Sequence, residues 1–259
     1  MSELLVESVD GVLVLTMNRP ERRNALSERM RLALVDRLAR EHASLTHRAI
    51  VLRGAAGSFC AGADLDLDTV LSRREVIEVE LQTGVNRIVT LLRTLPVPVI
   101  ASVDGAVAGA GVGFALAADL MLISDQARFV LSFTRLGAVP DAGVVAALLH
   151  RIGAARVTRV TMLGETLYAE ELLSLGLAYA MVAPERLDAE SIALAQSLAR
   201  GPTRAYGLLK RIINAAQGTP DEHYLNTEAS CQAQAFASED FEEGVRAFNA
   251  RRPPVFRGR

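Results

Sequence analysis

Short apolar runs dominate the first two thirds of the chain, and each ends at a polar or glycine-containing turn. Four of these runs have the length and composition of buried strands: Val12–Met17, Ala49–Leu52, Val99–Val103 and Leu120–Ile123. Segments with helical spacing of apolar residues lie between them. Because short buried strands that alternate with helices form largely parallel sheets covered on both faces, the pattern predicts an α/β fold.

Two helices are predicted between the first three strands. Ser27 offers an N-cap, and apolar residues then recur at helical spacing at Met30, Leu34 and Leu38. A longer helix is predicted over residues 72–94. Its inner side is expected to carry six apolar residues: Val76, Val79, Val85, Ile88, Leu91 and Leu92.

From about Ala154 onward the pattern is helical, and few strands are expected. Apolar residues recur at helical spacing in four segments: Glu170–Leu175, Leu187–Arg200, Thr203–Ala216 and Tyr224–Phe236. Gly201 and Pro202 break this pattern and place a boundary near residue 200. A helical region that follows an α/β core packs against a neighbouring subunit or over its own chain, and the sequence leaves both arrangements open.

The composition of the 259-residue chain excludes several classes of protein. Half of the residues are apolar, which excludes intrinsic disorder, and a net charge of −2 argues against nucleic acid as the main partner. The longest uncharged stretch, Gly105–Ala118, is shorter than the ~20 residues that a membrane span needs. The first residues lack the pattern of an export signal, so we expect a cytoplasmic protein with no membrane partner.

No residue pattern points to a metal site or a disulfide. Cys60 and Cys231 are far apart and form no CxxC motif, so reduced thiols are expected, and the four histidines lack metal-ligand spacing. Asp64, Asp66 and Asp68 alternate, but the glycine and the distal glutamate of a calcium-binding EF-hand loop are missing. These acids are interpreted as solvated or helix-starting residues.

Two loops of small residues could expose backbone N–H groups. Ser58–Leu65 follows a predicted strand, and Gly105–Phe114 connects a strand to an alanine-rich helix. The glycine spacing of the second loop, GxGxG in the middle of the chain, matches a dinucleotide fingerprint only weakly. Each loop alone could be an ordinary connection. Together they could deliver two N–H donors to one thioester oxygen, each contributing about 3 kcal/mol to transition-state stabilisation.

Five segments, taken together and in order, strongly resemble the enoyl-CoA hydratase/isomerase (crotonase) family. They are Asn18–Leu26, Phe59–Leu65, Gly105–Asp119, Leu136–Gly143 and Phe248–Phe256. The resemblance implies a crotonase-like spiral of ββα units that binds acyl-CoA over residues 1–200, and a C-terminal helical trimerisation region over 201–259. It also implies a homotrimer or a dimer of trimers, and a coenzyme A thioester as substrate with no cofactor.

The same resemblance implies roles for residues at matching positions. The N–H groups of Ala63 and Ala110 would form the oxyanion hole. Backbone atoms of Ala61 and of the segment Ala63–Asp66, which contains Asp64 and Leu65, would line the path of the adenine and pantetheine. Arg22 or Arg23, and Arg251 of a neighbouring subunit, would meet the phosphates, although each arginine could equally be a solvated surface charge.

The sequence departs from the family's hydratases at both catalytic glutamates. Gly113 and Phe133 stand at these positions, and neither side chain transfers a proton. Asp141 lies where dienoyl-CoA isomerases and isomerases of phenylacetate degradation carry an acidic group. One base beside an oxyanion hole can move a double bond, because it removes a proton at one carbon and returns it at another. The alternative for Asp141 is an N-cap of the following helix.

Three functions follow from these departures. The first is an enoyl-CoA double-bond isomerase with Asp141 as proton shuttle and with Phe133 in the acyl pocket. The second is a hydratase that recruits Glu75, Glu78 or Glu80. The third is a non-catalytic acyl-CoA-binding protein. A dehalogenase-like role with Asp141 as nucleophile has less support, because no histidine lies near it in sequence.

Overall fold

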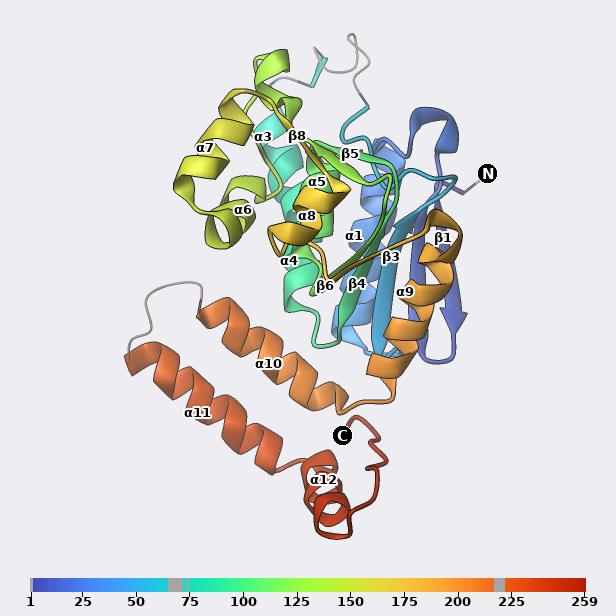
Figure 1. Ribbon diagram of the computed structural model, residues 1–259, viewed down its shortest axis with the longest axis vertical. Helices are drawn as coiled ribbons and strands as arrows, with labels where there is room; N and C mark the ends of the chain where they lie inside the picture. The colour runs from blue at the N-terminus through green and yellow to red at the C-terminus, as the bar shows by residue number, and fades with distance from the viewer. Residues whose placement is uncertain (1, 65–71, 74, 217–221) are drawn as a thin grey trace.

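The computed structural model describes residues 2–64, 72–73, 75–216 and 222–259 and has an α/β core with a helical C-terminal arm (Figure 1). A six-stranded sheet has the order β1-β2-β3-β4-β6-β9. Its strands are β1 (Leu4–Val9), β2 (Val12–Met17), β3 (Ala49–Gly54), β4 (Val99–Val103), β6 (Leu120–Ser124) and β9 (Ala180–Val182). Within this sheet, as described, β1 and β2 pair antiparallel, and the other neighbouring strands pair parallel. The four predicted strands and the α/β class are confirmed.

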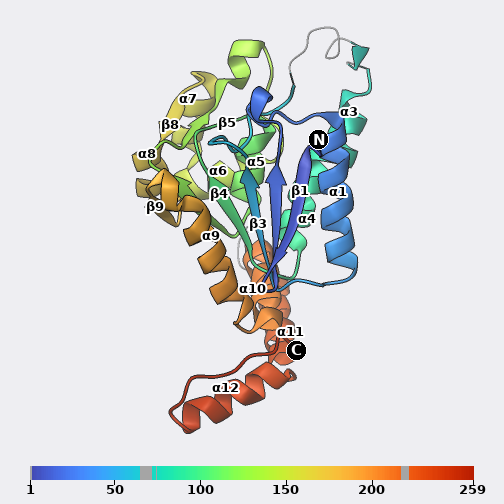
Figure 2. The same cartoon turned by 90° about the vertical axis from the view of Figure 1, so that its right-hand side faces the viewer.

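Both faces of this sheet are covered, which explains the continuous apolar runs. Every residue of β2 is buried. Leu13 and Leu15 pack into the larger core cluster with α1 (Glu28–Ala43) and α4 (Asn86–Thr94), whereas Val12 and Val14 face α9 (Pro184–Ala199). Figure 2 shows α1 and α9 on opposite sides of the strands. In a strand buried on both faces, apolar and polar residues do not alternate, because neither side faces water.

The structure has a second sheet of three short strands, which was not predicted from the sequence. It has the order β5-β7-β8 and consists of β5 (Ala106–Ala108), β7 (Arg128–Val130) and β8 (Thr166–Tyr168). Each strand has three residues, which is too short for a hydrophobic period to be recognised. β1 and β9 were missed as well. β1 exposes most of its side chains, and β9 has only three residues.

The helix predicted from Ser27 is confirmed, and the longer helix is confirmed only in part. Ser27 Oγ accepts a hydrogen bond from the Met30 N–H at 3.1 Å and caps α1. Instead of one helix over 72–94, the structure has α3 (Ile77–Glu80), a π-helical turn η2 (Leu81–Val85) and α4. Val76 and Val79 are exposed, so their predicted place on the inner side was wrong. Figure 2 places α3 beyond the ends of the strands, where the core does not reach.

Several helices complete the core. They are η1 (Pro20–Arg22), α5 (Ala110–Ala117), η3 (Ser132–Leu136), α6 (Val144–Ile152), α7 (Ala154–Met162) and α8 (Ala169–Ser174). α6 and α7 were not predicted. Both cysteines are buried, unbridged thiols, as expected, and burial raises the pKa of the Cys60 thiol to about 11.

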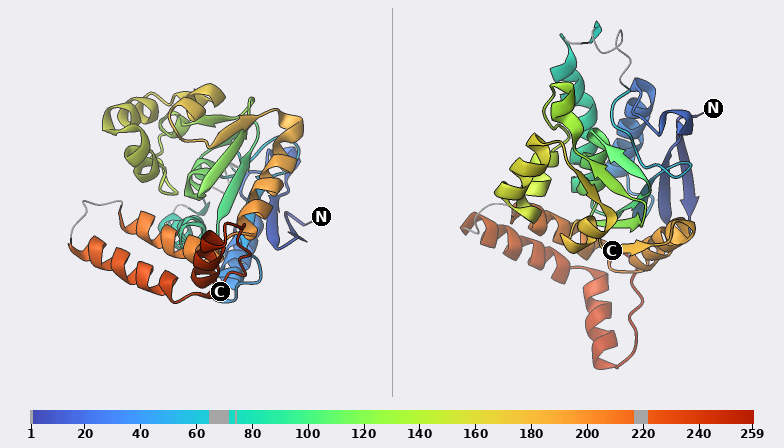
Figure 3. Two further views of the ribbon diagram at one scale, coloured as in Figure 1. Left: turned by 60° about the horizontal axis from the view of Figure 1, so that its bottom comes forward. Right: turned by 45° about the horizontal axis from the view of Figure 1, so that its top comes forward.

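The C-terminal arm consists of α10 (Thr203–Ala215), α11 (Glu222–Phe236) and α12 (Glu239–Asn249), the last of which was not predicted. The arm extends away from the core (Figures 1 and 3). Lys210 ties α10 to the core, because its Nζ lies 2.8 Å from Asp119 Oδ2 and donates to the carbonyl oxygens of Leu92 and Val97. The break between α9 and α10 coincides with the boundary predicted near residue 200. The division into an acyl-CoA-binding part and an oligomerisation part stays a prediction.

None of the helices in the described part of the chain is both long and apolar enough to cross a lipid bilayer.

Candidate active site

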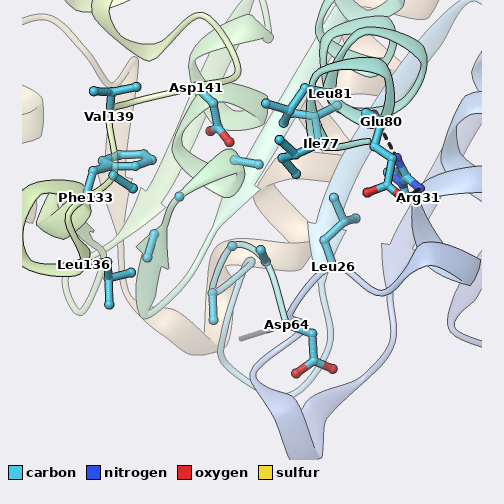
Figure 4. A pocket seen from close by; sticks show the side chains of 18 of the residues that line it. Leu26, Arg31, Asp64, Ile77, Glu80, Leu81, Phe133, Leu136, Val139 and Asp141 are labelled. Carbon is cyan, nitrogen blue, oxygen red and sulfur yellow. Dashed lines mark hydrogen bonds and ion pairs between the residues drawn. The ribbon is translucent and has the colours of Figure 1, made fainter. Parts of the chain in front are cut away.

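A cavity of about 490 Å³ opens between the two small-residue loops, the start of α1, the α3–η2 segment and the loop before α6. Apolar side chains make up most of its wall, and a few polar groups converge on it (Figure 4). The lining residues include Leu26, Arg31, Ala61, Ala63, Asp64, Ile77, Glu80, Leu81, Val85, Ala110, Phe133, Leu136, Val139 and Asp141. A concave, mainly apolar site with few polar groups is typical of small-molecule binding.

The two loops meet at a pair of glycines. Gly62 has φ +88° and Gly109 has φ +53°, which are conformations that glycine adopts without strain. A Cβ built on Gly109 would lie 3.1 Å from the Gly62 Cα and 3.8 Å from the Ala63 nitrogen. The backbones therefore touch, and this contact brings Ala63 and Ala110 into one cavity although they lie far apart in sequence.

Backbone hydrogen bonds hold both loops in place, and two backbone N–H groups in the loops remain without a backbone acceptor in the described part of the chain. The Leu26 N–H donates to the Gly62 carbonyl at 2.7 Å, and the Ala108 N–H donates to the Cys60 carbonyl at 3.0 Å. Among the described residues, no backbone acceptor is paired with the N–H groups of Ala63 or Ala110. Ala110 is the first residue of α5, so its N–H has no acceptor within the helix and lies at the positive end of the helix dipole. Both amides can therefore donate to an oxygen that gains negative charge.

The carboxyl group of Asp141 lies among apolar side chains in the wall of the cavity. In Figure 4 it points into the space between Phe133 and Val139 on one side and Ile77 and Leu81 on the other. Its Oδ1 is buried and has no hydrogen-bond partner in the described structure. Burial raises the pKa of Asp141 above its usual value, because the charged form loses its hydration.

The alternative role of Asp141 as a helix N-cap was wrong. α6 begins at Val144, and its N-cap is Gly143, without a side-chain cap. Asp141 contributes only its backbone carbonyl, which accepts from the Val144 N–H at 3.0 Å. Ala142 and Gly143 both have positive φ, so the chain turns sharply between the carboxylate and the helix. The side chain is thereby left free to face the cavity.

Ala142 also closes the space beside Gly113, where the resemblance to hydratases predicts a glutamate. A Cβ built on Gly113 would lie 2.4 Å from both the Cβ and the carbonyl oxygen of Ala142. No side chain fits there unless the loop moves, because real Cβ atoms do not approach backbone this closely. Phe133, where the resemblance predicts the other glutamate of hydratases, lies in the cavity wall and is almost completely buried. Both positions are therefore filled by non-ionisable groups.

The three glutamates of the hydratase hypothesis have different surroundings. Glu75 and Glu78 are exposed and do not line the cavity. Glu80 lines it, but two arginines hold its carboxylate: Arg73 at 2.7 Å and Arg31 at 4.0 Å. The carboxylate of Glu80 is therefore engaged by side-chain donors and is not free to hold a water molecule in the cavity.

Other predicted binding residues are only partly brought together. Ala61 and Asp64 line the cavity, and Asp64 is held by Arg19 at 2.8 Å. Leu65 and Asp66 lie outside the described residues.

The predicted phosphate-binding arginines lie elsewhere. Arg22 is the last residue of η1 and Arg23 follows it, and neither lines the cavity. Arg251 follows α12 on the arm, so within one chain it is not part of this site.

Sequence reasoning missed the side of the cavity formed by Leu26, Arg31, Ile77, Leu81 and Val85, and the loop residues Leu136 and Val139. One signal was available. Arg31 is a charged residue next to Met30 in an apolar helical pattern, yet it is 8% exposed. A buried arginine needs acceptors, which places it beside another element.

Comparisons with known proteins agree with this geometry. A family model described as enoyl-CoA hydratase/isomerase matches residues 7–259. The chain is 39% identical to a protein of Rhodobacter capsulatus named "Probable enoyl-CoA hydratase", over 98% of this chain and 97% of that protein. It is 36% identical to the 1,2-epoxyphenylacetyl-CoA isomerase of Escherichia coli over the full length of both. A solved structure titled enoyl-CoA hydratase/isomerase from Cupriavidus metallidurans has a TM-score of 0.92, with 31% identity, 100% of this chain and 97% of that chain covered.

Proposed function

Since this chain belongs to the enoyl-CoA hydratase/isomerase family, we propose that it is an enoyl-CoA double-bond isomerase that acts without a cofactor. One observation carries the proposal: Asp141, whose Oδ1 is buried and has no hydrogen-bond partner among the described residues, lines the same cavity as Ala63 and Ala110. The family supplies the acyl-CoA substrate class, and the relatives include proteins named as hydratases and as isomerases.

The reaction would need only one base and two N–H donors. In a 3-enoyl-CoA, Asp141 takes a proton from C2, and the electron pair spreads over the double bond to the thioester oxygen. The N–H groups of Ala63 and Ala110 stabilise the negative charge on that oxygen. Asp141 then returns the proton to C4, which gives the conjugated 2-enoyl-CoA and restores the carboxylate. No electron, water molecule or leaving group is exchanged.

Three features of the site favour isomerisation over hydration. The Gly113 position is closed by Ala142, Phe133 is apolar, and Glu80 is engaged by two arginines. Hydration by the family's two-glutamate route needs a held and activated water molecule. The raised pKa of Asp141 suits a group that must both accept and release a proton.

The test is an assay of the purified chain with a 3-enoyl-CoA, in which formation of the conjugated thioester is followed by absorbance and by mass spectrometry. We expect the 2-enoyl isomer and no mass increase by one water. Accumulation of 3-hydroxyacyl-CoA from a 2-enoyl-CoA would instead support the hydratase. Tight binding of acyl-CoA without any product would support the non-catalytic binder.

We also propose that the C-terminal arm assembles the chain into a homotrimer or a dimer of trimers. Apolar side chains are exposed along the arm, including Leu225 on α11 and Phe248 on α12, of which Phe248 is 83% exposed. Exposed apolar surface on an arm that leaves its own core favours burial against other copies. Such an assembly would also allow Arg251 of one copy to approach the cavity of another.

Sedimentation equilibrium is expected to give three or six times the 27.8 kDa chain mass. The double variant Leu225→Asp, Phe248→Asp should sediment as a smaller species, because two charges would have to be buried in the interface. The matched control is Leu32→Asp, which changes an exposed apolar residue on α1 of the core and should leave the mass unchanged. A wild-type chain that sediments as a monomer would contradict the proposal.

A further inference from the structure

Arg31 crosses from α1 to the π-helical turn that forms one wall of the cavity. Its Nη1 donates to the backbone carbonyl of Glu80 at 2.8 Å, and its Nη2 lies 4.0 Å from the Glu80 carboxylate. Figure 4 shows this contact at the edge of the cavity, next to Ile77 and Leu81. The Glu80 carbonyl directly precedes η2, so the bond anchors the wall where the helix changes from α to π geometry.

Gly84 is the second part of the same contact. A Cβ built on Gly84 would lie 2.5 Å from Cδ, 2.6 Å from Nη1 and 3.1 Å from Cγ of Arg31. The alkyl part of Arg31 therefore lies flat on the backbone of the π-turn, in a space that only glycine leaves open. Glycine has low helix propensity, so its presence here has a packing reason.

A second arginine, Arg73, also holds the Glu80 side chain in place. Arg73 holds the other side of the Glu80 carboxylate, with Nε–Oε distances of 2.8 and 2.9 Å. Arg31 is buried, and each guanidinium donor left without an acceptor in such a place costs free energy. The contact is therefore well defined, and π-turns held in this way are frequent at functional sites.

We propose that Arg31 is a positioning residue: it fixes the π-turn wall and thereby sets the affinity for the acyl group, without touching the reacting atoms. Ile77, Leu81 and Val85 lie on this wall and face the cavity. If the thioester oxygen is held by the N–H groups of Ala63 and Ala110, a medium-length acyl chain is expected to extend to this wall, whereas a two-carbon acyl group is expected to end before it. The inference rests on the proposed function in that the cavity must hold the acyl part of a thioester.

Binding of non-reacting thioesters tests the proposal by calorimetry, with octanoyl-CoA and acetyl-CoA as probes. Arg31→Ala is expected to weaken octanoyl-CoA binding about tenfold and acetyl-CoA binding less than about twofold. Arg31→Lys should restore part of the lost binding free energy, since its alkyl stem can still cover Gly84 and it keeps a positive charge beside Glu80. Equal losses for both thioesters would overturn the proposal, as they would indicate a general structural effect.

A double-variant cycle tests the contact itself. Gly84→Ala alone is expected to weaken octanoyl-CoA binding about fivefold, because its Cβ displaces Arg31, but less than about twofold in a chain that already carries Arg31→Ala. Identical effects in both backgrounds would overturn the proposal. Should Arg31→Ala not fold, Arg31→Gln takes its place in both experiments.

The outcome is separable from that of the isomerase assay. Selective loss of octanoyl-CoA binding in a chain that forms no isomer would support the role of Arg31 and contradict that of Asp141. The reverse combination would contradict Arg31 alone.

Discussion

Replacing Asp141 by asparagine is expected to lower kcat for isomerisation about a thousandfold, with little change in the dissociation constant for a saturated acyl-CoA. The amide has nearly the shape of the carboxylate but cannot take a proton from C2. The two N–H donors of Ala63 and Ala110 remain, so the thioester still binds. Steady-state kinetics with a 3-enoyl-CoA and calorimetry with its saturated analogue measure the two quantities separately.

Asp125→Asn is the matched control, since Asp125 is an exposed acid on the loop between β6 and β7 and does not line the cavity. It should keep the wild-type kcat. Unchanged turnover in the Asp141 variant would remove this residue from the proton transfer and leave the base unassigned.

The pH profile provides an independent check on the same residue. A base acts only when ionised, so kcat/KM should fall on the acid side as Asp141 becomes protonated. Because burial raises the pKa of Asp141, the midpoint of this fall should lie above about 3.9, the ordinary value for aspartate. The residual activity of the asparagine variant should lack this acid limb. If activity fell with the same midpoint pH in the wild-type chain and in the asparagine variant, the base would be a different group.

Replacing Gly109 by alanine is expected to lower kcat/KM about a hundredfold or more. Removal of one N–H donor from an oxyanion hole typically lowers the rate by this factor. Its φ of +53° and ψ of −134° are unfavourable for any residue with a Cβ. The added Cβ would also press on the Gly62 Cα at 3.1 Å. Both effects push the two loops apart, so the N–H groups of Ala63 and Ala110 no longer converge on one oxygen.

Gly153→Ala separates loss of the donors from backbone strain. Gly153 has φ +75° and ψ 159°, so it too needs glycine, but a Cβ there meets nothing within 4 Å. It connects α6 to α7 away from the cavity. This control should lower the free energy of unfolding by about 1–3 kcal/mol and retain kcat. Equal activity losses in the two variants would argue against an oxyanion hole at Ala63 and Ala110.

The sequence determined the parts of the fold that follow from local patterns. Strands β2, β3, β4 and β6 were predictable because burial on both faces makes them continuously apolar, and the cap of α1 was predictable because Ser27 acts within one helical turn. The small-residue loops and Asp141 were also identified from the sequence, but their roles came from the resemblance to the family and not from spacing.

Only the tertiary structure decided how the site is closed. The contact of Gly62 with Gly109, the place of Ala142 over Gly113 and the π-turn under Arg31 all join segments far apart in sequence. Local propensity contains no information about such contacts, because they depend on which strand ends and helices lie next to each other after folding. The same reason explains why the predicted inner face of residues 72–94 failed at Val76 and Val79: an apolar period indicates a buried face only where the core extends far enough to cover it.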